Sequence, residues 1–185
     1  MRGRSAHAGI APEKGIDAIR VLACIVASLE LGRYDAETTA NIGVIRGGSS
    51  VNTVPEHAVA EGEVRSMRRE TVGELLDHFV RVAVREAEVA SALVSVRAAW
   101  DFEPFALPID HLVCQRAEYA LRRIGLDPRP TASAGGSDAN SFNARGLPAV
   151  NFGVGAQNPH ANDEFVLIED LEKGADLALA LVTPP

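Results

Sequence analysis

The sequence predicts an α+β protein that begins with a four-stranded antiparallel sheet carrying two helices on one face. Two observations lead to this prediction. Residues 38–48, 51–66 and 92–102 alternate polar with apolar or small side chains, which is the two-residue period of a strand. Residues 11–32 and 69–89 repeat apolar side chains at helical spacing. Together with a strand that ends in the first residues, the order is β-α-β-β-α-β, the split-βαβ arrangement.

The two predicted helices can both cover one face of this sheet. The first has Pro12 and Glu13 in its first turn, and Gly32 marks its end. The second, residues 69–89, is amphipathic along its whole length. The apolar side chains expected to face the sheet are Ile16, Ile19, Leu22, Ala23 and Val26 in the first helix, and Val72, Leu75, Leu76, Phe79, Val82 and Ala83 in the second.

The strand segments are bounded by turn residues. The motif "GRSAHAG", residues 3–9, is expected to end the first strand. Gly47 and Gly48 turn the chain after the second strand. Pro55 in the third strand marks a bulge or an edge position, because proline cannot donate a ladder hydrogen bond. Residues 92–102 are expected to form the fourth strand.

A boundary follows where two prolines break the pattern in residues 103–110. We therefore predict one domain over residues 1–105 and a second part over residues 106–185. The second part is expected to be an incomplete α/β layer, because it alternates helix and strand but has too few strands for a complete sheet. Its predicted elements are a helix at 111–125, short strands at 129–134 and 148–153, a glycine turn before a short helix at 135–142, and a last helix from about Ile168.

The composition limits the classes of function. The chain has 185 residues, of which 46% are apolar, and a formal net charge of −7. An acidic protein is a poor partner for nucleic acid or anionic membranes. The longest apolar stretch, which starts at Val21, is too short to span a bilayer, and the first residues lack the apolar core of a signal peptide. Cys24 and Cys114 lie in helical patterns, so we expect buried thiols in a cytoplasmic protein.

Three polar residues of the first part are candidates for a binding or catalytic site. His7 lies among small residues at a strand-to-helix junction, which leaves room for another molecule to approach the ring. Taken alone, a histidine tied to a turn carbonyl is the better interpretation. Asn52 and Arg65 lie on or beside strands, and an arginine offers a fork of donors that matches a carboxylate. The alternative for Arg65 is an edge-strand side chain in solvent.

The glycine turn of the second part is a candidate anion site. Gly135, Gly136 and Ser137 open a short helix, and free backbone N–H groups at such a position can hold a carboxylate or an oxyanion. The alternative is an ordinary helix start capped by Ser137 or Asp138. A double glycine is a weak signal, and it lacks the lysine of a nucleotide-binding loop.

A histidine loop is the last candidate. The predicted strand at 148–153 leads into a loop that carries His160, followed closely by Asp163 and Glu164. Zinc sites use histidine, aspartate and glutamate ligands, and nearby carboxylates orient a ligating ring. The alternative is a solvent-exposed loop histidine. One histidine alone cannot hold a catalytic metal.

The combination of these motifs resembles one family. The order is "GRSAHAGIAPEKGIDAI", "TTANIGVIRGGSSVNTVPE", "EVRS", "GGSDANSFNARGLPAVNFGVG" and "PHANDEF". It is similar to the co-catalytic zinc metallopeptidases that include peptidase T, carboxypeptidase G, aminoacylase and succinyl-diaminopimelate desuccinylase, and most similar to the peptidase T-like branch. The resemblance covers nearly the whole chain. Members have a catalytic α/β domain interrupted by a lid domain that dimerises, which identifies residues 1–105 as a lid and residues 106–185 as the C-terminal portion of a catalytic domain.

The resemblance assigns a role to each candidate. His160 matches the last ligand of a pair of zinc ions. His7 matches the lid histidine that stabilises the oxyanion in the partner subunit's active site, and Asn52 matches the lid asparagine that reaches the same site. Arg65 matches the arginine that binds a substrate carboxylate. The segment Gly135, Gly136 and Ser137 matches the loop that helps to bind that carboxylate.

The sequence departs from the family pattern in one large respect. The other metal ligands and the general base of the family lie upstream of the lid, and this chain contains at most a partial zinc site. We therefore expect a fragment of a peptidase that hydrolyses short peptides, inactive as this chain alone. Two alternatives stay open: an amidohydrolase of N-acyl amino acids, and a non-catalytic dimerisation module.

We also expect a homodimer through the lid. The strand at 38–48 offers an edge that a second copy can pair with. The first helix carries a second, partly apolar side with Val21, Cys24, Ile25 and Ser28, which is more than one buried face needs. The alternative is a monomer whose extra helix face packs on the C-terminal segment.

Overall fold

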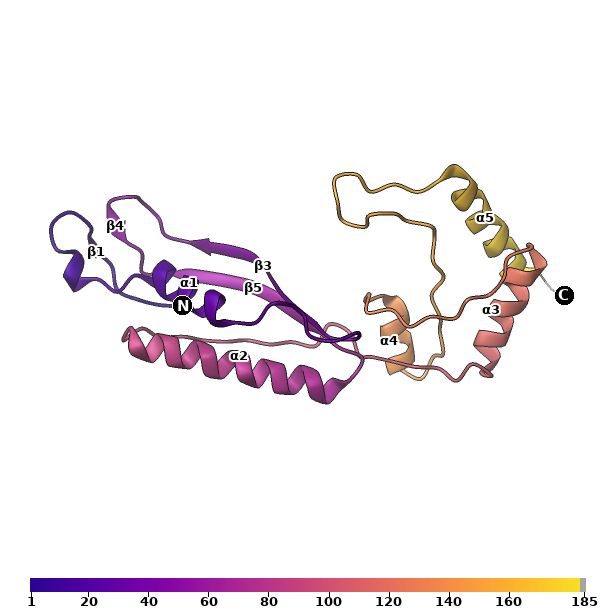
Figure 1. The fold of residues 1–185 in the computed structure, drawn as a ribbon, viewed down its shortest axis with the longest axis horizontal. Helices are drawn as coiled ribbons and strands as arrows, with labels where there is room; N and C mark the ends of the chain where they lie inside the picture. Colours follow the sequence, from indigo (N-terminus) through magenta and orange to yellow (C-terminus); the bar gives the residue numbers. More distant parts are fainter. Residues whose placement is uncertain (184–185) are drawn as a thin grey trace. The chain divides into compact units, whose positions relative to one another are not determined.

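The computed structural model describes residues 1–183 (Figure 1). The chain forms two compact units, Met1–Asp101 and Phe102–Pro185. The elements of the first unit are β1 (Ala6–His7), a 3-10 turn η1 (Pro12–Lys14), α1 (Ala18–Ser28), β2 (Gly32–Arg33), β3 (Thr39–Gly47), β4 (Thr53–Val54), β5 (Ala58–Arg65) and α2 (Arg69–Val89). Those of the second unit are α3 (Leu112–Arg123), α4 (Asp138–Ala144) and α5 (Ile168–Val182).

The predicted α+β class with antiparallel strands is confirmed, although the pairing differs in detail. The strands form one sheet in the order β2-β3-β5 and a separate two-stranded sheet of β1 and β4. A bulge lies between Ile42 and Val44 of β3, whereas the sequence predicted a bulge or an edge position at Pro55. Residues 92–102 were expected to form a strand, but they contribute a single bridge from Leu93 to Arg2. Arg2 also bridges His57, so the four-stranded arrangement exists in outline at the start of the chain.

Helix α1 begins at Ala18 and not in the region of Pro12. The reason is a competing backbone pairing, because the N–H of Ile16 donates to the C=O of Arg4 at 2.8 Å and the C=O of Ile16 accepts from the N–H of Arg4 at 3.0 Å. This pairing holds Ile16 in extended backbone, outside any helix. Asp17 then caps α1 by accepting a hydrogen bond from the N–H of Arg20 at 2.9 Å. Pro12 instead starts the separate turn η1.

The buried face of α1 also differs from the prediction. Val21 and Ile25, expected on the outer side, are buried, whereas Ile19 and Ala23 are exposed. The cause is that α1 packs against two elements at once. Its Ala18 and Leu22 cluster with Ala58 of β5, and its Val21 and Ile25 cluster with Ala83 of α2. The buried stripe of the helix therefore lies between the sheet and α2, and Val21 and Ile25 of the predicted outer side are part of the core, whereas Cys24 and Ser28 are exposed.

Helix α2 follows the prediction more closely. Val72, Val82 and Ala83 are buried, and Leu75, Leu76 and Phe79 are half-buried. The helix packs against α1 and β5, and in Figure 1 it runs alongside the strands. The first unit is thus a sheet with two helices packed together on it.

The second unit has helices but no regular sheet in its described part. Residues 129–134 and 148–153, predicted to be strands, have no assigned strand conformation. The reason is physical, since a strand needs a neighbour to bond its N–H and C=O groups. Helices α3 and α5 contact each other. A bridge between Gln157 and Phe165 closes the loop that carries His160.

The prediction of two buried cysteines is wrong. Cys24 is exposed and Cys114 is half-buried. Cys24 lies on the side of α1 that faces away from both apolar clusters, so it is accessible although its neighbour Ile25 is not.

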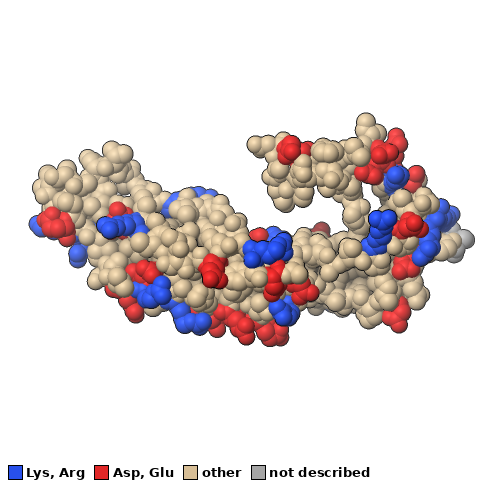
Figure 2. All heavy atoms as spheres, in the orientation of Figure 1, with Lys and Arg blue, Asp and Glu red and all other residues tan. Residues whose placement is uncertain are grey.

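The surface charge is mixed. On the face drawn in Figure 2, side chains of both signs are interspersed along the first unit and along the second. None of the described helices combines the length and the apolar character needed to cross a membrane.

Candidate functional site

The structure brings two of the predicted site residues together in the first unit. His7 is the last residue of β1 and pairs with Thr53 of β4, the residue after Asn52. The N–H of Ala8 donates to the C=O of Asn52 at 2.9 Å, so the two strands place His7 and Asn52 on neighbouring backbone. Both side chains are exposed. We refer to β1, β4 and the residues between His7 and Ala11 as the lid tip.

The His7 ring is oriented by its own turn. Its Nδ1 accepts a hydrogen bond from the N–H of Gly9 at 3.2 Å. In the neutral ring the proton then belongs to Nε2, which leaves an N–H donor at the far side of the imidazole. The carbonyl of His7 accepts bonds from the N–H groups of Ile10 and Ala11 at 3.2 and 3.0 Å. The alternative interpretation expected the ring to donate to a turn carbonyl. Here the ring is held within its own turn, but its Nδ1 accepts from the backbone N–H of Gly9.

Arg65 lies at the other end of the sheet from the lid tip. It is the last residue of β5, seven positions beyond Ala58, which corresponds to about 23 Å of strand. Its guanidinium holds Glu63 in a two-pronged contact, with Nε to Oε1 and Nη2 to Oε2 both at 2.8 Å. This hydrogen bonding lowers the pKa of Glu63 and raises the pKa of Arg65. The arginine fork thus binds a carboxylate in this structure, and that carboxylate is its neighbour's.

Glu63 is the site residue that the sequence reasoning missed. A signal was available, because residues two apart on a strand share a face. In "EGEVR" that rule puts Glu63 beside Arg65. A substrate carboxylate that binds Arg65 has to displace Glu63 or share the guanidinium with it.

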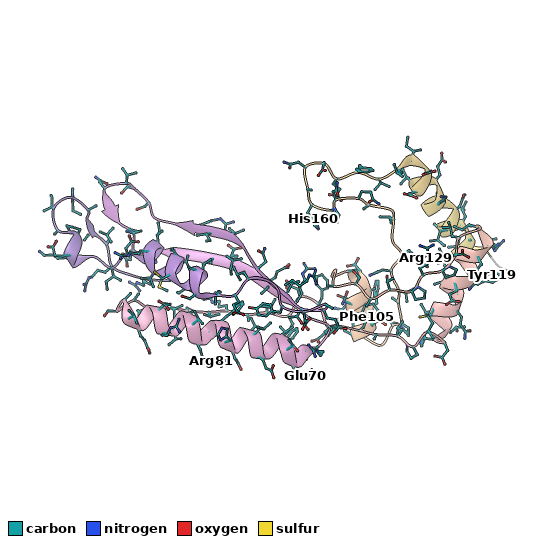
Figure 3. All side chains as sticks on the ribbon, in the orientation of Figure 1. Glu70, Arg81, Phe105, Tyr119, Arg129 and His160 are labelled. Carbon is teal, nitrogen blue, oxygen red and sulfur yellow. The ribbon has the colours of Figure 1, made fainter. Side chains whose placement is uncertain are left out.

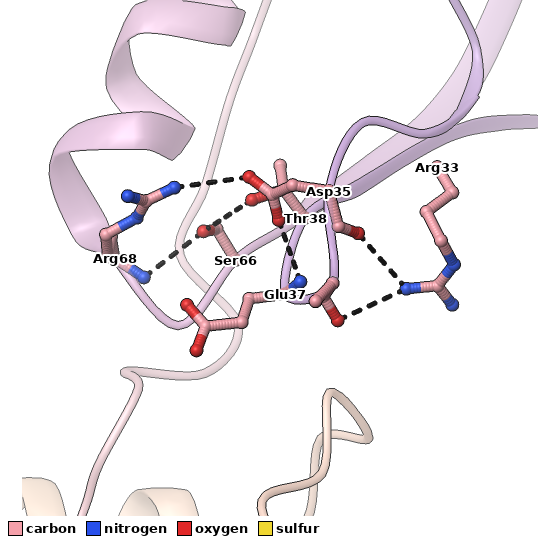
Figure 4. Close-up of polar contacts among 7 residues, drawn as sticks. Arg33, Asp35, Glu37, Thr38, Ser66 and Arg68 are labelled. Atoms are coloured by element: carbon pink, nitrogen blue, oxygen red, sulfur yellow. Dashed lines mark hydrogen bonds and ion pairs between the residues drawn. The ribbon is translucent and has the colours of Figure 1, made fainter.

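A polar network surrounds the end of β5 (Figure 4). The fully buried Thr38 contacts the hydroxyl of Ser66 at 3.0 Å, and Ser66 accepts from the N–H of Arg68 at 3.2 Å. Arg68 in turn pairs with Asp35 at 3.2 Å. The pKa of Asp35 is lowered, first of all because its carboxylate accepts a hydrogen bond from the N–H of Glu37. The network ties the turn before β3 to the start of α2 and so holds the residues next to Arg65 in place.

In the second unit, the predicted anion loop is bonded internally. The N–H of Gly135 donates to Ser133 Oγ at 3.1 Å, and the N–H of Ser137 donates to Asn140 Oδ1 at 3.0 Å. Ser137 is the N-cap of α4, as the alternative interpretation predicted. Gly136 is required by packing, because a Cβ there would lie 2.5 Å from a ring carbon of Phe102. Two of the three amides that could bind an anion therefore already have partners.

His160 lies on an exposed loop of the same unit, where Figure 3 labels it. Its backbone has a positive φ of 67° and its N–H donates to Glu164 Oε2 at 3.0 Å. The other nearby carboxylate, Asp163, accepts from the side chain of Asn158 at 2.9 Å. Both carboxylates therefore stabilise the loop backbone or its amide side chain.

The residues of this chain do not by themselves fit a metal centre. Among the described residues, no group of three histidine, cysteine, aspartate or glutamate side chains could hold an ion together. His160 supplies one imidazole, and its two carboxylate neighbours are engaged as described above. In this loop His160 is one exposed imidazole on a turn that its neighbours stabilise.

Residues 1–91 match the family model described as a peptidase dimerisation domain. The first unit is therefore similar to peptidase dimerisation domains over most of its length. The predicted resemblance to peptidase T and succinyl-diaminopimelate desuccinylase is confirmed by this match together with the relatives that follow.

Relatives of known sequence agree. An uncharacterised protein of Bacillus subtilis, YqjE, is 36% identical over 97% of this chain and 48% of its own length. Peptidase T of Fusobacterium nucleatum is 35% identical over 40% of this chain and 18% of its own length. The succinyl-diaminopimelate desuccinylase of Cereibacter sphaeroides is 26% identical over 93% of this chain and 46% of its own length.

Two solved structures extend the likeness to the fold. The aminopeptidase PepT of Bacillus cereus is 37% identical with a TM-score of 0.76, over 98% of this chain and 48% of that one. A tripeptidase of Staphylococcus aureus is 31% identical with a TM-score of 0.82, over the same shares of the two chains. The chain thus spans about half the length of the relatives that match it throughout.

Proposed function

We propose that this chain is the dimerisation domain and adjoining catalytic portion of a zinc-dependent peptidase that hydrolyses short peptides. The observation that carries the proposal is the placement of His7 and Asn52 on neighbouring backbone at the lid tip, inside the segment that matches a peptidase dimerisation domain. The similarity to an aminopeptidase and a tripeptidase over nearly the whole chain supports the substrate class.

The geometry supports a role for the lid tip in charge stabilisation. With Nδ1 of His7 bonded to Gly9, the Nε2–H is a donor for an oxyanion that forms as the scissile amide is attacked. Asn52 brings an amide to the same tip. Arg65 binds the substrate carboxylate in competition with Glu63, and the segment 135–137 contributes its remaining amide.

The metal is expected to be zinc, as two ions in the intact enzyme. His160 would supply one imidazole ligand, and zinc would polarise the scissile carbonyl and activate water. The other ligands and the general base would come from outside this sequence. The chain alone is therefore proposed to be inactive and to bind zinc weakly at His160.

We propose that the lid forms a homodimer through the edge of β3. In the described part of the chain, β2 pairs with Thr39 and Ala40, and the edge from Asn41 to Gly47 has no further strand beside it. Such an edge can pair with its own copy about a two-fold axis. The lid tip supports the same assembly, because Ile10 is 78% exposed and Val51 fully exposed beside His7 and Asn52.

The dimer is tested by light scattering at micromolar concentration. The variant Ile45→Lys adds a charge on the β3 edge, at a side chain that is 55% exposed. The matched control is Val59→Lys on β5, where the side chain is 51% exposed but the strand is not at that edge. We expect a dimer mass for the unaltered chain and the control, and a monomer mass for Ile45→Lys. A monomer mass for the unaltered chain would contradict the proposed homodimer.

The first test of the peptidase proposal is to read the DNA sequence upstream of the Met1 codon. In-frame sequence that encodes an H-x-D pattern supports the peptidase, and the protein from that longer frame should release amino acids from tripeptides in a zinc-dependent manner. His160→Ala should lower the rate at least about a hundredfold, by analogy with loss of a metal ligand, while His78→Ala on the exposed side of α2 should leave it unchanged. A stop codon in frame shortly before the Met1 codon would contradict the peptidase and favour a non-catalytic dimerisation module.

A second candidate function is hydrolysis of an N-acyl amino acid. The likeness to a succinyl-diaminopimelate desuccinylase over 93% of the chain favours it. Both substrate classes present a carboxylate to Arg65. A panel of tripeptides and N-succinyl and N-acetyl amino acids separates them, since the preferred class should show the higher kcat/KM.

A further inference from the structure

A salt bridge occupies the arginine that the proposed function assigns to a substrate carboxylate. Both oxygens of Glu63 are used, since Oε1 accepts from Nε of Arg65 and Oε2 accepts from Nη2, each at 2.8 Å. Two parallel N–H···O bonds of this kind combine strength with a fixed geometry. The protein therefore already holds, at this fork, the same chemical group that a peptide ligand would bring to it.

The backbone keeps Glu63 within reach of Arg65. Both residues belong to β5, and residues two apart on a strand project from the same face. Their α-carbons are separated by about 7 Å of strand, so rotation of the side chains is enough to restore the salt bridge after it opens. Glu63 competes as an intramolecular partner, and a carboxylate from solution has to overcome its high effective concentration.

The neighbours of this salt bridge add to the cost of displacing Glu63. The β3 residues opposite the pair, Thr39 and Asn41, carry no charge. Glu61, on the same face of β5, is a second carboxylate and is bonded to Arg46. A ligand carboxylate that takes the guanidinium therefore leaves Glu63 near another negative side chain, and one that shares it places two negative groups on one cation. Either outcome weakens the binding of the ligand by like-charge repulsion.

Glu63 is ionised at neutral pH. Its hydrogen bonds from Arg65 lower its pKa, and the opposing effect of partial burial is smaller. The same hydrogen bonding raises the pKa of Arg65. Both partners therefore carry their full charge, and the resident carboxylate is the same acceptor as the carboxylate of a ligand.

We propose that Glu63 is a resident competitor that raises the concentration at which any carboxylate occupies Arg65. Small monocarboxylates and a dipeptide product then leave the site, whereas a substrate with further contacts still binds. The inference rests on the proposed function, in which Arg65 binds a substrate carboxylate. It adds that Glu63 sets how strongly the site prefers a peptide acid to the corresponding peptide amide, because the amide does not compete for the guanidinium as an anion.

The first test uses the full chain of 185 residues and requires no peptidase activity. Sodium acetate is titrated at constant ionic strength, and NMR follows the Nε–H resonance of Arg65, which is assigned by its loss in Arg65→Lys. In Glu63→Gln we expect the association constant for acetate to rise about two- to fivefold, the range that corresponds to loss of an exposed ion pair.

Glu61→Gln is the matched control for this titration. Its side chain is 57% exposed against 52% for Glu63, and it lies on the same face of the same strand, but it bonds to Arg46. We expect the control to bind acetate at Arg65 as the unaltered chain does. An association constant that does not rise in Glu63→Gln, or that rises equally in the control, would overturn the proposal. So would a Glu63→Gln protein whose Arg65 resonance does not respond to acetate.

The second test uses the protein from the longer frame. Glu63→Gln should lower the KM for a tripeptide and the inhibition constants of acetate and the dipeptide product about two- to fivefold each. The KM for the tripeptide amide should stay unchanged, because this substrate brings no carboxylate to Arg65. A general change of the site would instead move the acid and the amide together.

The two tests separate this inference from the proposed function. If the longer protein hydrolyses no peptide, the proposed function fails, and the acetate titration still decides the role of Glu63. If the longer protein hydrolyses peptides but Glu63→Gln changes the KM for the acid and for the amide alike, the inference about Glu63 fails alone.

Discussion

The two units of this chain contain the same kind of sequence pattern but reach different structures. In the first unit, alternating segments become β3 and β5, which pair along eight residues of β5. In the second, residues 129–134 and 148–153 have strand-like sequence and form no strand. The difference lies in the neighbours that each segment finds. The alternation of polar and apolar side chains predicts which face a strand would bury. A strand forms only where a neighbouring segment bonds its backbone N–H and C=O groups.

The same contrast holds for the cores. The clusters of buried apolar residues found in the described chain combine α1 with β5 and α1 with α2, all in the first unit. In the second unit, Ala120, Ala139 and Leu177 are buried one to a helix, and large apolar residues such as Leu171 and Leu179 of α5 are exposed. We infer that the first unit has the larger free energy of unfolding and unfolds more cooperatively than the second.

The largest loss of stability is expected from a substitution in the core of the first unit. Ile25→Asp places a carboxylate in the cluster of Val21 and Ala83, where it has no partner, and should cost more than about 3 kcal/mol. Urea unfolding followed by circular dichroism measures the loss. The control is Cys24→Asp at the adjacent exposed position, which should shift stability by less than about 0.5 kcal/mol. Equal losses of stability in the two variants would contradict the burial of Ile25 and the exposure of Cys24 on α1.

Hydrogen exchange sharpens the comparison between paired and unpaired segments. Amides of β5 that bond to β3, such as that of Val59, should exchange about a hundredfold or more slowly than those of residues 148–153. Mass spectrometry of the exchanged chain resolves the two regions. Comparable protection in both would mean that the second unit contains strand pairing in solution, and the contrast would then disappear.

A glycine substitution probes packing in the second unit. Gly136→Ala brings a Cβ to 2.5 Å from the Phe102 ring, and the clash should destabilise the start of α4 by about 1–3 kcal/mol. Gly135→Ala is the matched control, since the nearest atom there is the Ser133 hydroxyl at 3.3 Å. Thermal unfolding of both variants gives the difference. If the two glycine variants lose the same stability, the Phe102 contact does not explain the glycine.

The smallest effect concerns the ion pair at the end of β5. The folded-state pKa of Glu63 is lowered by its hydrogen bonds from Arg65, so the stabilisation is present above the ordinary glutamate pKa. It is lost as the pH falls through the lowered value. Because both side chains are partly exposed, the contribution should be about 0.5 kcal/mol or less.

The measurement compares Glu63→Gln with the unaltered chain in urea at neutral and at acid pH. The variant should be less stable at neutral pH and equal at a pH below the lowered pKa. Glu74→Gln, on the exposed side of α2, should show no such convergence. A Glu63→Gln difference that grows on acidification would reverse the assigned sign.

Much of the first unit could be predicted from sequence. The order of helices and strands, the α+β class and the antiparallel pairing follow from periodicity and turn residues. The start of α1 could not be predicted, because Ile16 pairs with Arg4 across the chain. The buried face of α1 was missed for a related reason, since it depends on α2 and β5 together.

The candidate site divides in the same way. Its residue types were found from local motifs, and β1 and β4 then brought His7 and Asn52 together through a pairing between distant segments. The occupation of Arg65 by Glu63 is local enough to have been read from "EGEVR". The internal bonding of the 135–137 loop is equally local, because Ser133 and Asn140 lie within three residues of the amides they bond, and the helix-cap alternative had predicted Ser137 as a cap.

The sequence by itself determined where this chain can form helices, which segments alternate as strands, and which side chains carry the candidate chemistry. These properties depend on residues close together in the chain, through helical and strand periods, caps and turns. The tertiary structure decided which alternating segments became strands, which side of α1 is buried, and how β1 and β4 bring His7 next to Asn52. Each of those outcomes requires a neighbour from a distant part of the chain, because backbone groups and apolar faces are satisfied in pairs.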